Sequence, residues 1–366
     1  MKAKSSAQDI VVRALSRPQE LSSWSLSAWA ELVRRARVAG LLGRIDGLNG
    51  AAPAQARKHF ESAARLGLAQ RAEVLRELAF IRRALDGLGH PVVVLKGAAY
   101  VLAGLPAAQG RVFSDIDILV PKSAIAEVES RLMLAGWAGT TATAYDQRYY
   151  RQWMHELPPM QHMHRQTALD VHHTILPETA RLKPPAALLF DAARSVAGDD
   201  FFLVLAAEDM LLHSMTHLFM NEDMHHGLRD LSDLDLLLRH FGADPGFWDR
   251  LLTRAQALDL VRPLFYGLHM TTALLGTPVP QPSLKAVAAL GPAWPLRPLM
   301  TALWRRVLSS KQAPGAGWVA SLAQFFIYVR GHWLRMPVPL LVRHLGIKAL
   351  GLHERGLGQS QVGKEG

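Results

Sequence analysis

Apolar residues recur at helical spacing along the first quarter of the chain. Residues 5–88 are rich in Ala, Leu and Arg and poor in β-branched residues, a composition that favours helix. In the clearest periodic stretch, residues 56–88, the predicted apolar face carries Leu68, Leu75, Leu78, Ala79, Leu85 and Leu88. Gly87, Gly89 and Pro91 end this helix, which we expect to pack on a sheet.

A different pattern follows the helix. The β-branched run Val92–Leu95 predicts a buried strand, and it ends at the dipeptide Lys96-Gly97. Residues 98–105 suit a helix, and residues 114–120 predict a second strand after a loop that contains Pro and Gly. Strand, tight turn, helix and strand therefore form one compact α/β unit.

Two acidic side chains fall on one face of the second predicted strand. Because side chains alternate along a strand, Asp115 and Asp117 project to one side while Ile116 and Ile118 project to the other. Carboxylates held close together repel each other unless a cation lies between them, and Mg²⁺ binds one or two carboxylates together with water and phosphate oxygens. A Lys-Gly turn at a helix start would add N–H groups and a cation for the phosphates. The pattern favours a metal–phosphate site over the alternative, a solvated polar face.

These segments resemble the nucleotidyltransferase superfamily typified by DNA polymerase beta. Its pattern is an apolar strand, a Gly-containing turn with a helix, a strand with Asp-x-Asp or Asp-x-Glu, and a third carboxylate on a later strand. Here LKG, SDIDILV and ALDVHH, which contains Asp170, are similar to an uncharacterised bacterial branch over roughly residues 75–240. The chain departs from the superfamily at the turn, where Lys96 precedes Gly97 and no Ser follows.

The resemblance implies a role for individual residues. The implied metal ligands and catalytic groups, for Mg²⁺ or Mn²⁺, are Asp115, Asp117 and Asp170. The implied nucleotide- and phosphate-binding residues are Lys96, Gly97, Arg111 and Ser114. Further candidates for substrate contact are His172, Arg229 and Asp230. For the last two, the alternative is an exposed helix face with a partner three or four residues away.

The alternation of side chains along a strand also predicts the position of the third carboxylate, that of Asp170. Leu169 and Val171 would face one way, and Asp170 and His172 the other, so Asp170 lies beside Asp117 if their strands are neighbours. His172 would orient Asp170 or bind substrate; the alternative is a half-buried strand residue. Nucleotidyl transfer needs a carboxylate that helps to hold the metal and favours deprotonation of the attacking hydroxyl.

The remaining pattern divides the chain into regions. We expect a crossover helix over residues 123–135, a strand or hairpin over 137–150, a loop and hairpin edge over 152–165, and helices over 186–275. The expected division is an N-terminal helical region (1–88), a nucleotidyltransferase α/β core (89–185), a helical substrate or cap domain (186–300) and a basic aromatic helical tail (301–366).

Zinc is an alternative metal. Nine of the sixteen histidines lie between residues 155 and 226, and the four-residue spacing of His213 and His217 puts both imidazoles on one face of a predicted helix. There is no HExxH motif, no cysteine and no third ligand by spacing. Buried imidazoles that make ordinary polar contacts explain these histidines better.

Composition and charge narrow the class of protein. The 366 residues are 49% hydrophobic and 20% charged, which is typical of a globular protein. Residues 1–90 carry fifteen Lys and Arg against eight Asp and Glu, and residues 301–366 nine against two, so each end is +7 and the middle is −4. Basic ends suit anionic partners, the alternative being a solvated Arg-rich surface. The absence of cysteine rules out disulfides and thiolate metal sites, and it fits a cytoplasmic protein.

The tail interleaves aromatic and basic residues over 301–350. It would dock on the core or make a peripheral contact with a membrane or a partner. Residues 312–329 carry no charge, but their Pro, Gly, Ser and Gln content makes them a poor membrane span, so we expect no integral span. The N-terminus lacks the apolar segment of a signal peptide.

The sequence therefore predicts an α+β protein, a small mixed-sheet α/β nucleotidyltransferase core flanked by helical regions. The predicted reaction is Mg²⁺-dependent transfer of a nucleoside monophosphate from a nucleoside triphosphate to the hydroxyl of a small-molecule or macromolecular acceptor. One alternative is a degenerate module that binds nucleotide without turnover. The other is a basic interaction protein for nucleic acid or an anionic membrane surface, whose binding would fall steeply with salt.

Overall fold

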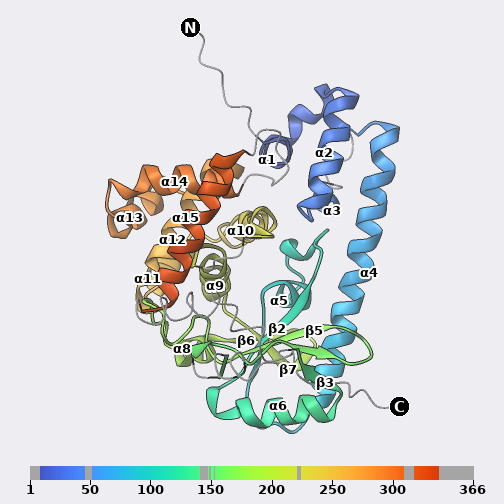
Figure 1. The fold of residues 1–366 in the computed structure, drawn as a ribbon, viewed down its shortest axis with the longest axis vertical. Helices are drawn as coiled ribbons and strands as arrows, with labels where there is room; N and C mark the ends of the chain where they lie inside the picture. The colour runs from blue at the N-terminus through green and yellow to red at the C-terminus, as the bar shows by residue number, and fades with distance from the viewer. Residues whose placement is uncertain are drawn as a thin grey trace, which may run out of the picture.

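The protein is mostly helical and is built around one mixed sheet (Figure 1). The computed structural model describes residues 9–45, 52–140, 147, 150, 151, 153–220, 224–308 and 317–337. In these residues seven strands pair in the order β3-β4-β5-β2-β1-β7-β6, with parallel and antiparallel neighbours. The predicted α+β class is confirmed.

Among the described residues, four α-helices precede the sheet: α1 (Ile10–Ser16), α2 (Leu26–Val38), α3 (Leu42–Ile45) and α4 (Ala54–Ala84). The long α4 runs along one side of the molecule (Figure 1), and its main neighbours are helices, namely α2, α3, α5 and α6. The predicted apolar face is partly wrong, because Leu68 and Leu75 are 68% and 44% exposed. The buried residues of α4 include Phe60, Gly67, Val74 and Ile81, at intervals of seven, so the two leucines lie one residue beyond the packed stripe.

The predicted strand–helix–strand unit is confirmed. β1 (Val92–Leu95) pairs antiparallel with β2 (Asp115–Leu119), and Leu95 lies opposite Asp117. All four residues of β1 are buried because the strand lies between β2 and β7. The helix α5 (Lys96–Leu102) starts earlier than expected, since Lys96 is already its first residue. The Lys-Gly dipeptide is therefore the beginning of a helix that follows the strand directly.

A crossover joins β2 to its other neighbour. The predicted helix is α6 (Ile125–Leu134), and the left-handed Gly136 (φ 94°) follows it. β5 (Ala168–His172) runs parallel to β2. β4 (Met160–His162) pairs with both β5 and β3 (Trp137–Gly139), so the hairpin edge expected over 152–165 is present. Most of the strand expected over 137–150 lies outside the described residues.

The continuous helical region expected over 186–275 is wrong in one place. After α8 (Ala186–Ala192), the chain forms the hairpin β6 (Arg194–Val196) and β7 (Asp199–Val204). β7 pairs parallel with β1, so this segment belongs to the sheet. The aromatic and branched run of β7 and the left-handed Gly198 (φ 81°) are strand and turn signals. Their effect on structure outweighs the Ala- and Leu-rich composition around them.

Helices dominate the rest of the chain. They are α9 (Ala207–Met220), α10 (Gly227–Phe241), α11 (Phe247–Ala257), α12 (Val261–Leu275), α13 (Gln281–Leu290), α14 (Leu296–Val307) and α15 (Trp318–Arg335). The nearly fully buried α9 is central, because it contacts α5, α10, α11, α12 and α15. This bundle covers the sheet on the side opposite α6 (Figure 1).

The tail docks on the helical bundle. Its helix α15 packs against α14 and α9, and Arg330 donates a hydrogen bond of 2.8 Å from Nη1 to the carbonyl of Phe219. Several of its large apolar residues remain exposed, namely Trp318, Phe325, Phe326 and Trp333. Of the helices that the structure describes, none has the length and apolarity needed to cross a bilayer. Residues 338–366, with the rest of the basic tail, lie outside the described residues.

Candidate metal and phosphate site

The three predicted carboxylates lie together on one face of the sheet. β2 and β5 are parallel neighbours, in which Asp117 is directly opposite Asp170 and Asp115 is opposite Ala168. Side chains two residues apart on a strand share a face, and so do residues opposite each other on neighbouring strands. The expected position of Asp170 beside Asp117 is confirmed.

Asp117 is the most enclosed of the three carboxylates. Its Oδ1 accepts a hydrogen bond of 2.6 Å from Lys96 Nζ and one of 3.0 Å from His172 Nε2. Burial would raise the pKa of Asp117, but the charge of Lys96 and the contact with His172 hold that pKa well below its usual range. Burial would likewise lower the pKa of Lys96, but Asp117 and Asp115 raise it. Lys96 thus forms a buried ion pair with a candidate metal ligand.

Asp170 is the carboxylate whose charge is least offset. Burial, followed by the like charges of Asp117 and Glu156, raises the pKa of Asp170 to about 7. Oxygens of Asp117 and Asp170 and a nitrogen of His172 all lie within 4.8 Å of one another. Carboxylate oxygens are the protein ligands that Mg²⁺ prefers, and a divalent cation would stabilise the charged form of Asp170. These residues therefore fit Mg²⁺ or Mn²⁺.

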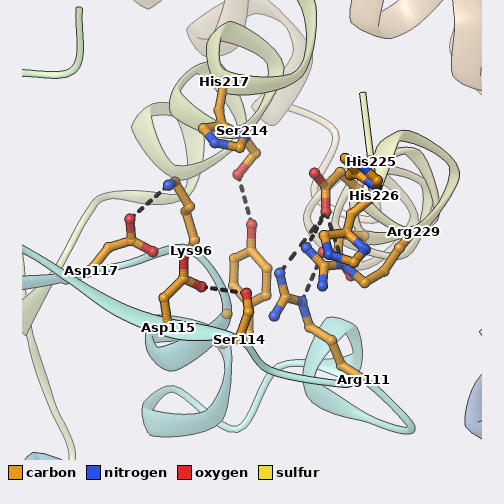
Figure 2. Close-up of a pocket in the computed structure, with 14 residues that line it drawn as sticks. Lys96, Arg111, Ser114, Asp115, Asp117, Ser214, His217, His225, His226 and Arg229 are labelled. Carbon is orange, nitrogen blue, oxygen red and sulfur yellow. Dashed lines mark hydrogen bonds and ion pairs between the residues drawn. The ribbon is translucent and has the colours of Figure 1, made fainter. Parts of the chain in front are cut away.

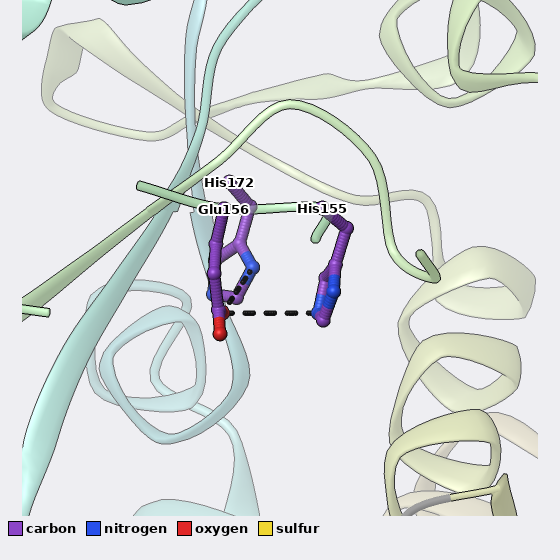
Figure 3. Close-up of side chains that lie close together, drawn as sticks. All are labelled: His155, Glu156 and His172. Atoms are coloured by element: carbon purple, nitrogen blue, oxygen red, sulfur yellow. Dashed lines mark ion pairs between the residues drawn. The ribbon is translucent and has the colours of Figure 1, made fainter. Parts of the chain in front are cut away.

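Glu156 is a site residue that the sequence analysis missed. It forms an isolated antiparallel bridge with His172, and the neighbouring Leu157 donates its N–H to the carbonyl of Val171 at 2.9 Å. Figure 3 shows the carboxylate of Glu156 beside two imidazoles: Oε2 is 3.1 Å from His172 Nδ1 and 3.7 Å from His155 Nε2. These three side chains form a second group with metal-ligand spacing. A Glu at a predicted hairpin edge was the only signal, and it did not reveal which residue it faces.

His172 joins Glu156 to Asp117. It is buried, with Nε2 toward Asp117 and Nδ1 toward Glu156. Burial would lower the pKa of His172, but the hydrogen bond to Asp117 and the charge of Glu156 raise it. The hydrogen bond of His172 is to the candidate metal ligand Asp117 and not to Asp170, the carboxylate that it was expected to orient. The alternative of a half-buried strand residue is wrong, because His172 is buried.

A cavity of about 180 Å³ opens beside Asp115 and Asp117 (Figure 2). All four predicted phosphate-binding residues line it, namely Lys96, Gly97, Arg111 and Ser114. Arg229 and Asp230 line it too, while Asp170 and His172 lie on the next strand and are not part of this lining. Ser114 donates a hydrogen bond of 2.8 Å to Asp115 Oδ1. The cavity thus brings cationic groups and carboxylates together.

Gly97 is required by a close approach of side chain to backbone. A Cβ at this position would lie 2.3 Å from Nη1 and 2.8 Å from Cζ of Arg111. The Arg111 guanidinium therefore lies against the start of α5, where a side chain at position 97 would displace it. This steric reason for glycine was not visible in the sequence.

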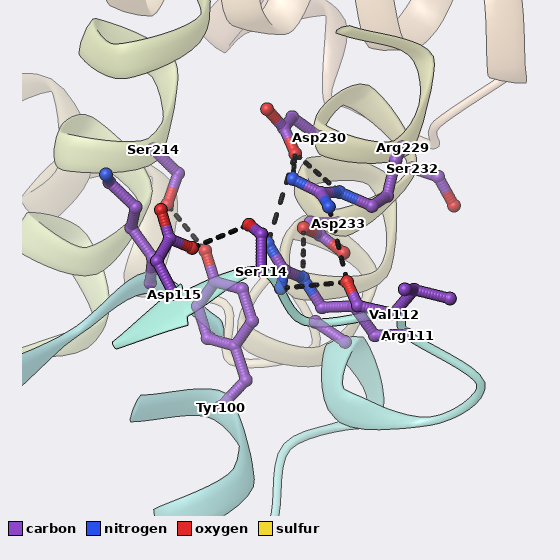
Figure 4. A network of polar contacts seen from close by, with 12 residues as sticks. Tyr100, Arg111, Val112, Ser114, Asp115, Ser214, Arg229, Asp230, Ser232 and Asp233 are labelled. Atoms are coloured by element: carbon purple, nitrogen blue, oxygen red, sulfur yellow. Dashed lines mark hydrogen bonds and ion pairs between the residues drawn. The ribbon is translucent and has the colours of Figure 1, made fainter. Parts of the chain in front are cut away.

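An arginine–aspartate network forms the wall of the cavity opposite the sheet (Figure 4). Arg111 Nε donates to Asp233 Oδ2 at 3.0 Å, and Arg44 donates to the other oxygen of Asp233. Burial would lower the pKa of Arg111, but Asp233 and Asp230 raise it. Arg44 comes from the short helix α3, so no local pattern predicted its contact with Asp233.

Arg229 and Asp230 belong to the same wall. Arg229 is buried and donates to Asp230 Oδ1 at 3.1 Å and to the carbonyl of Val112 at 3.2 Å. The alternative of an exposed helix face is therefore wrong. Tyr100 and Ser214 complete the wall with a buried hydrogen bond of 2.7 Å between their hydroxyls. Neither was singled out in the sequence, since a lone Tyr or Ser in an apolar helix gives no signal.

The zinc alternative at His213 and His217 gains no support. Both lie on α9, and burial lowers the pKa of both imidazoles, that of His213 to about 3. In the described part of the chain, the groups with metal-ligand spacing are the two around His172, and neither contains these histidines. His217 instead lines the cavity.

Fold and site together define a class. The structure matches the predicted nucleotidyltransferase core in three features. A strand and a helix are joined at Lys-Gly, the neighbouring strand carries two aspartates, and the next strand carries a third. Residues 25–276, well over half of the chain, match a family described as uncharacterised nucleotidyltransferase. The chain therefore belongs to this nucleotidyltransferase family. The match begins at Ser25, the N-cap of α2, and so includes Arg44, outside the 75–240 range expected from sequence. No curated protein and no solved structure matches the chain.

Proposed function

We propose that this protein transfers a nucleoside monophosphate from a nucleoside triphosphate to a hydroxyl group of an acceptor, with Mg²⁺ or Mn²⁺ at the carboxylates. The observation that carries the proposal is the pairing of Asp117 with Asp170 on neighbouring strands, with Asp117 and Asp115 lining a cavity that cationic side chains also reach. Membership of the family supports the reaction class. The bound ion would offset the negative charge of the carboxylates and of the phosphate oxygens.

The chain itself supplies cationic side chains for the triphosphate. Lys96, Arg111 and Arg229 reach the cavity from the start of α5, from the loop before β2 and from α10. Arg111 and Arg229 are held in place by Asp233 and Asp230, so they are oriented before a ligand binds. Gly97 leaves the space that lets Arg111 lie close to α5. Fixed cations of this kind need little reorganisation when charge develops on the phosphates.

Asp170 is suited to act on the acceptor. In the proposed step the acceptor oxygen forms a bond to the α-phosphorus, and its proton passes to Asp170. The bond from the α-phosphorus to the bridging oxygen breaks, and pyrophosphate leaves. With an ion bound at the carboxylates, Asp170 would be present as a charged carboxylate, which can accept this proton. His172 and Lys96 hold Asp117 in position through their hydrogen bonds to its Oδ1.

The test is transfer of label from α-³²P nucleotides in the presence of Mg²⁺ or Mn²⁺, with cell extract as the pool of acceptors. We expect label to reach an acceptor with the wild type and not with Asp115→Asn/Asp117→Asn. A matched control is Asp249→Asn, because Asp249 is an exposed aspartate on α11. Label that persists in the double variant would refute the assignment of the carboxylates, and no label from any of the four nucleotides would refute transfer.

A second function is favoured by one contact. Lys96 already forms an ion pair with Asp117, as expected of a module that binds nucleotide but no longer catalyses transfer. In that case nucleotide would bind in a metal-dependent way without any transfer of label. Equilibrium binding of labelled nucleotide, measured beside the transfer assay, separates the two functions.

A further inference from the structure

Lys96 has an unusual backbone. Its φ is +45°, in the left-handed region that residues with a side chain rarely adopt. In the described part of the chain, only Gln166 and Asp259 share this feature among residues other than glycine. Glycine would fit such a position without strain. A strained residue at the start of a site helix indicates that its side chain is needed there.

The side chain of Lys96 lies among the candidate metal ligands. Its ammonium group is 2.6 Å from Asp117 Oδ1, and the charge of Asp115 also acts on it. Only 16% of the Lys96 side chain is exposed, and Figure 2 shows the ammonium held beside Asp117 at the cavity. The ammonium therefore lies where a cation shared by Asp115 and Asp117 would be expected.

A second pair of carboxylates, Asp117 and Asp170, lies beside this ion pair. Asp170 is directly opposite Asp117, and no described residue donates a hydrogen bond to its carboxylate. Enzymes that transfer phosphoryl groups commonly clamp the attacking and leaving oxygens between two divalent ions about 3.5–4 Å apart. This chain has two carboxylate pairs, Asp115 with Asp117 and Asp117 with Asp170, and the ammonium of Lys96 lies at the first of them.

We propose that Lys96 is a built-in cation that replaces one of the two divalent ions, so that the site binds a single ion between Asp117 and Asp170. This inference rests on the proposed function in one respect, namely that the site binds a metal ion and a triphosphate. Since Lys96 also lines the cavity, its ammonium would face the phosphates of the nucleotide. The charge there is fixed by the chain and does not depend on the concentration of metal.

The test counts bound ions in the full-length protein. Mn²⁺ bound per chain is measured by equilibrium dialysis with the α,β-methylene analogues of the four nucleoside triphosphates, and electron paramagnetic resonance reports whether two ions are spin-coupled. We expect one uncoupled ion in the wild type and none in Asp170→Asn. In Lys96→Gly, where glycine suits the backbone and Asp115 and Asp117 lose their ammonium partner, we expect two coupled ions.

Gln166→Gly is the matched control. Gln166 has φ +61° in the exposed turn between β4 and β5, so its replacement relieves the same backbone strain away from the site. We expect its ion count to equal that of the wild type. Two coupled ions in the wild type would by themselves overturn the proposal. A single ion in Lys96→Gly would also overturn it. The proposal would also be overturned if the ion were lost in Glu156→Gln but retained in Asp170→Asn. That result would place the ion at the group of His155, Glu156 and His172.

The ion count does not depend on turnover. If ions are counted as expected but no label is transferred in the assay above, the inference on Lys96 stands and the proposed reaction fails. If label is transferred and the wild type holds two ions, the reaction stands and the inference fails.

Discussion

Replacement of Asp170 by Asn should make the metal-free protein more stable at neutral pH. The carboxyl group of Asp170 is enclosed beside Asp117 and Glu156, and burial with these like charges raises its pKa from an ordinary 3.8 to about 7. Asn keeps the shape of the side chain but cannot ionise. The variant therefore removes the cost of charging a buried carboxyl group beside two like charges.

The sign and size follow from the pKa. Between pH about 4 and about 7 the native protein keeps the proton on Asp170, whereas the unfolded chain has lost it. The stability due to this raised pKa is complete below pH about 4 and is lost as the pH rises through about 7. Each pH unit in this window costs the wild type about 1.4 kcal/mol. Three units give at most about 4 kcal/mol, of which about 3 kcal/mol falls between pH 5 and pH 8.

Urea unfolding in EDTA at pH 5, 6, 7 and 8 measures this effect. The free energy of unfolding of Asp170→Asn minus that of the wild type should grow by about 3 kcal/mol over this range and level off above pH 7. The exposed Asp249→Asn serves as a control, with a difference that stays flat. Saturating Mg²⁺ should stabilise the wild type at pH 8 and not Asp170→Asn. If the difference in the free energy of unfolding does not grow with pH, the conclusion that the Asp170 carboxyl group is enclosed and its charge uncompensated would be refuted.

Two further predictions test the neighbours of the carboxylates. Gly97→Ala should lower the free energy of unfolding, measured in urea, by about 1–3 kcal/mol, because the new Cβ would lie 2.3 Å from Arg111 Nη1. The control Gly139→Ala, at an exposed glycine, should change the free energy of unfolding little. Equal effects of the two variants would argue against the close approach of Arg111 to Gly97. Glu156→Gln should lower the pKa of His172 in an NMR titration, because Glu156 helps to raise it. An unchanged His172 pKa would contradict the contact between the two side chains.

Local patterns were sufficient where neighbours in sequence determine the structure. The buried strand β1 and the alternation of Asp115 and Asp117 on β2 follow from the pleat of a single strand, so they could be predicted without knowledge of the fold. The same reasoning missed β6 and β7, because a short hairpin within an Ala- and Leu-rich segment is stabilised mainly by its pairing with β1. It also misjudged Leu68 and Leu75, since periodicity shows that a helix is amphipathic but not which residues other elements cover.

The sequence by itself determined the α/β unit, the shared face of Asp115 and Asp117, and the resemblance that led to Asp170. Only the tertiary structure decided that Lys96 forms an ion pair with Asp117, that Glu156 contacts His172, and that Arg44 shares Asp233 with Arg111. The physical reason is separation along the chain. Alternation and helical period act over a few residues, whereas these contacts join residues 16 to 189 positions apart and depend on strand register and helix packing. The candidate metal ligands were therefore predictable, but the charges that control them were not.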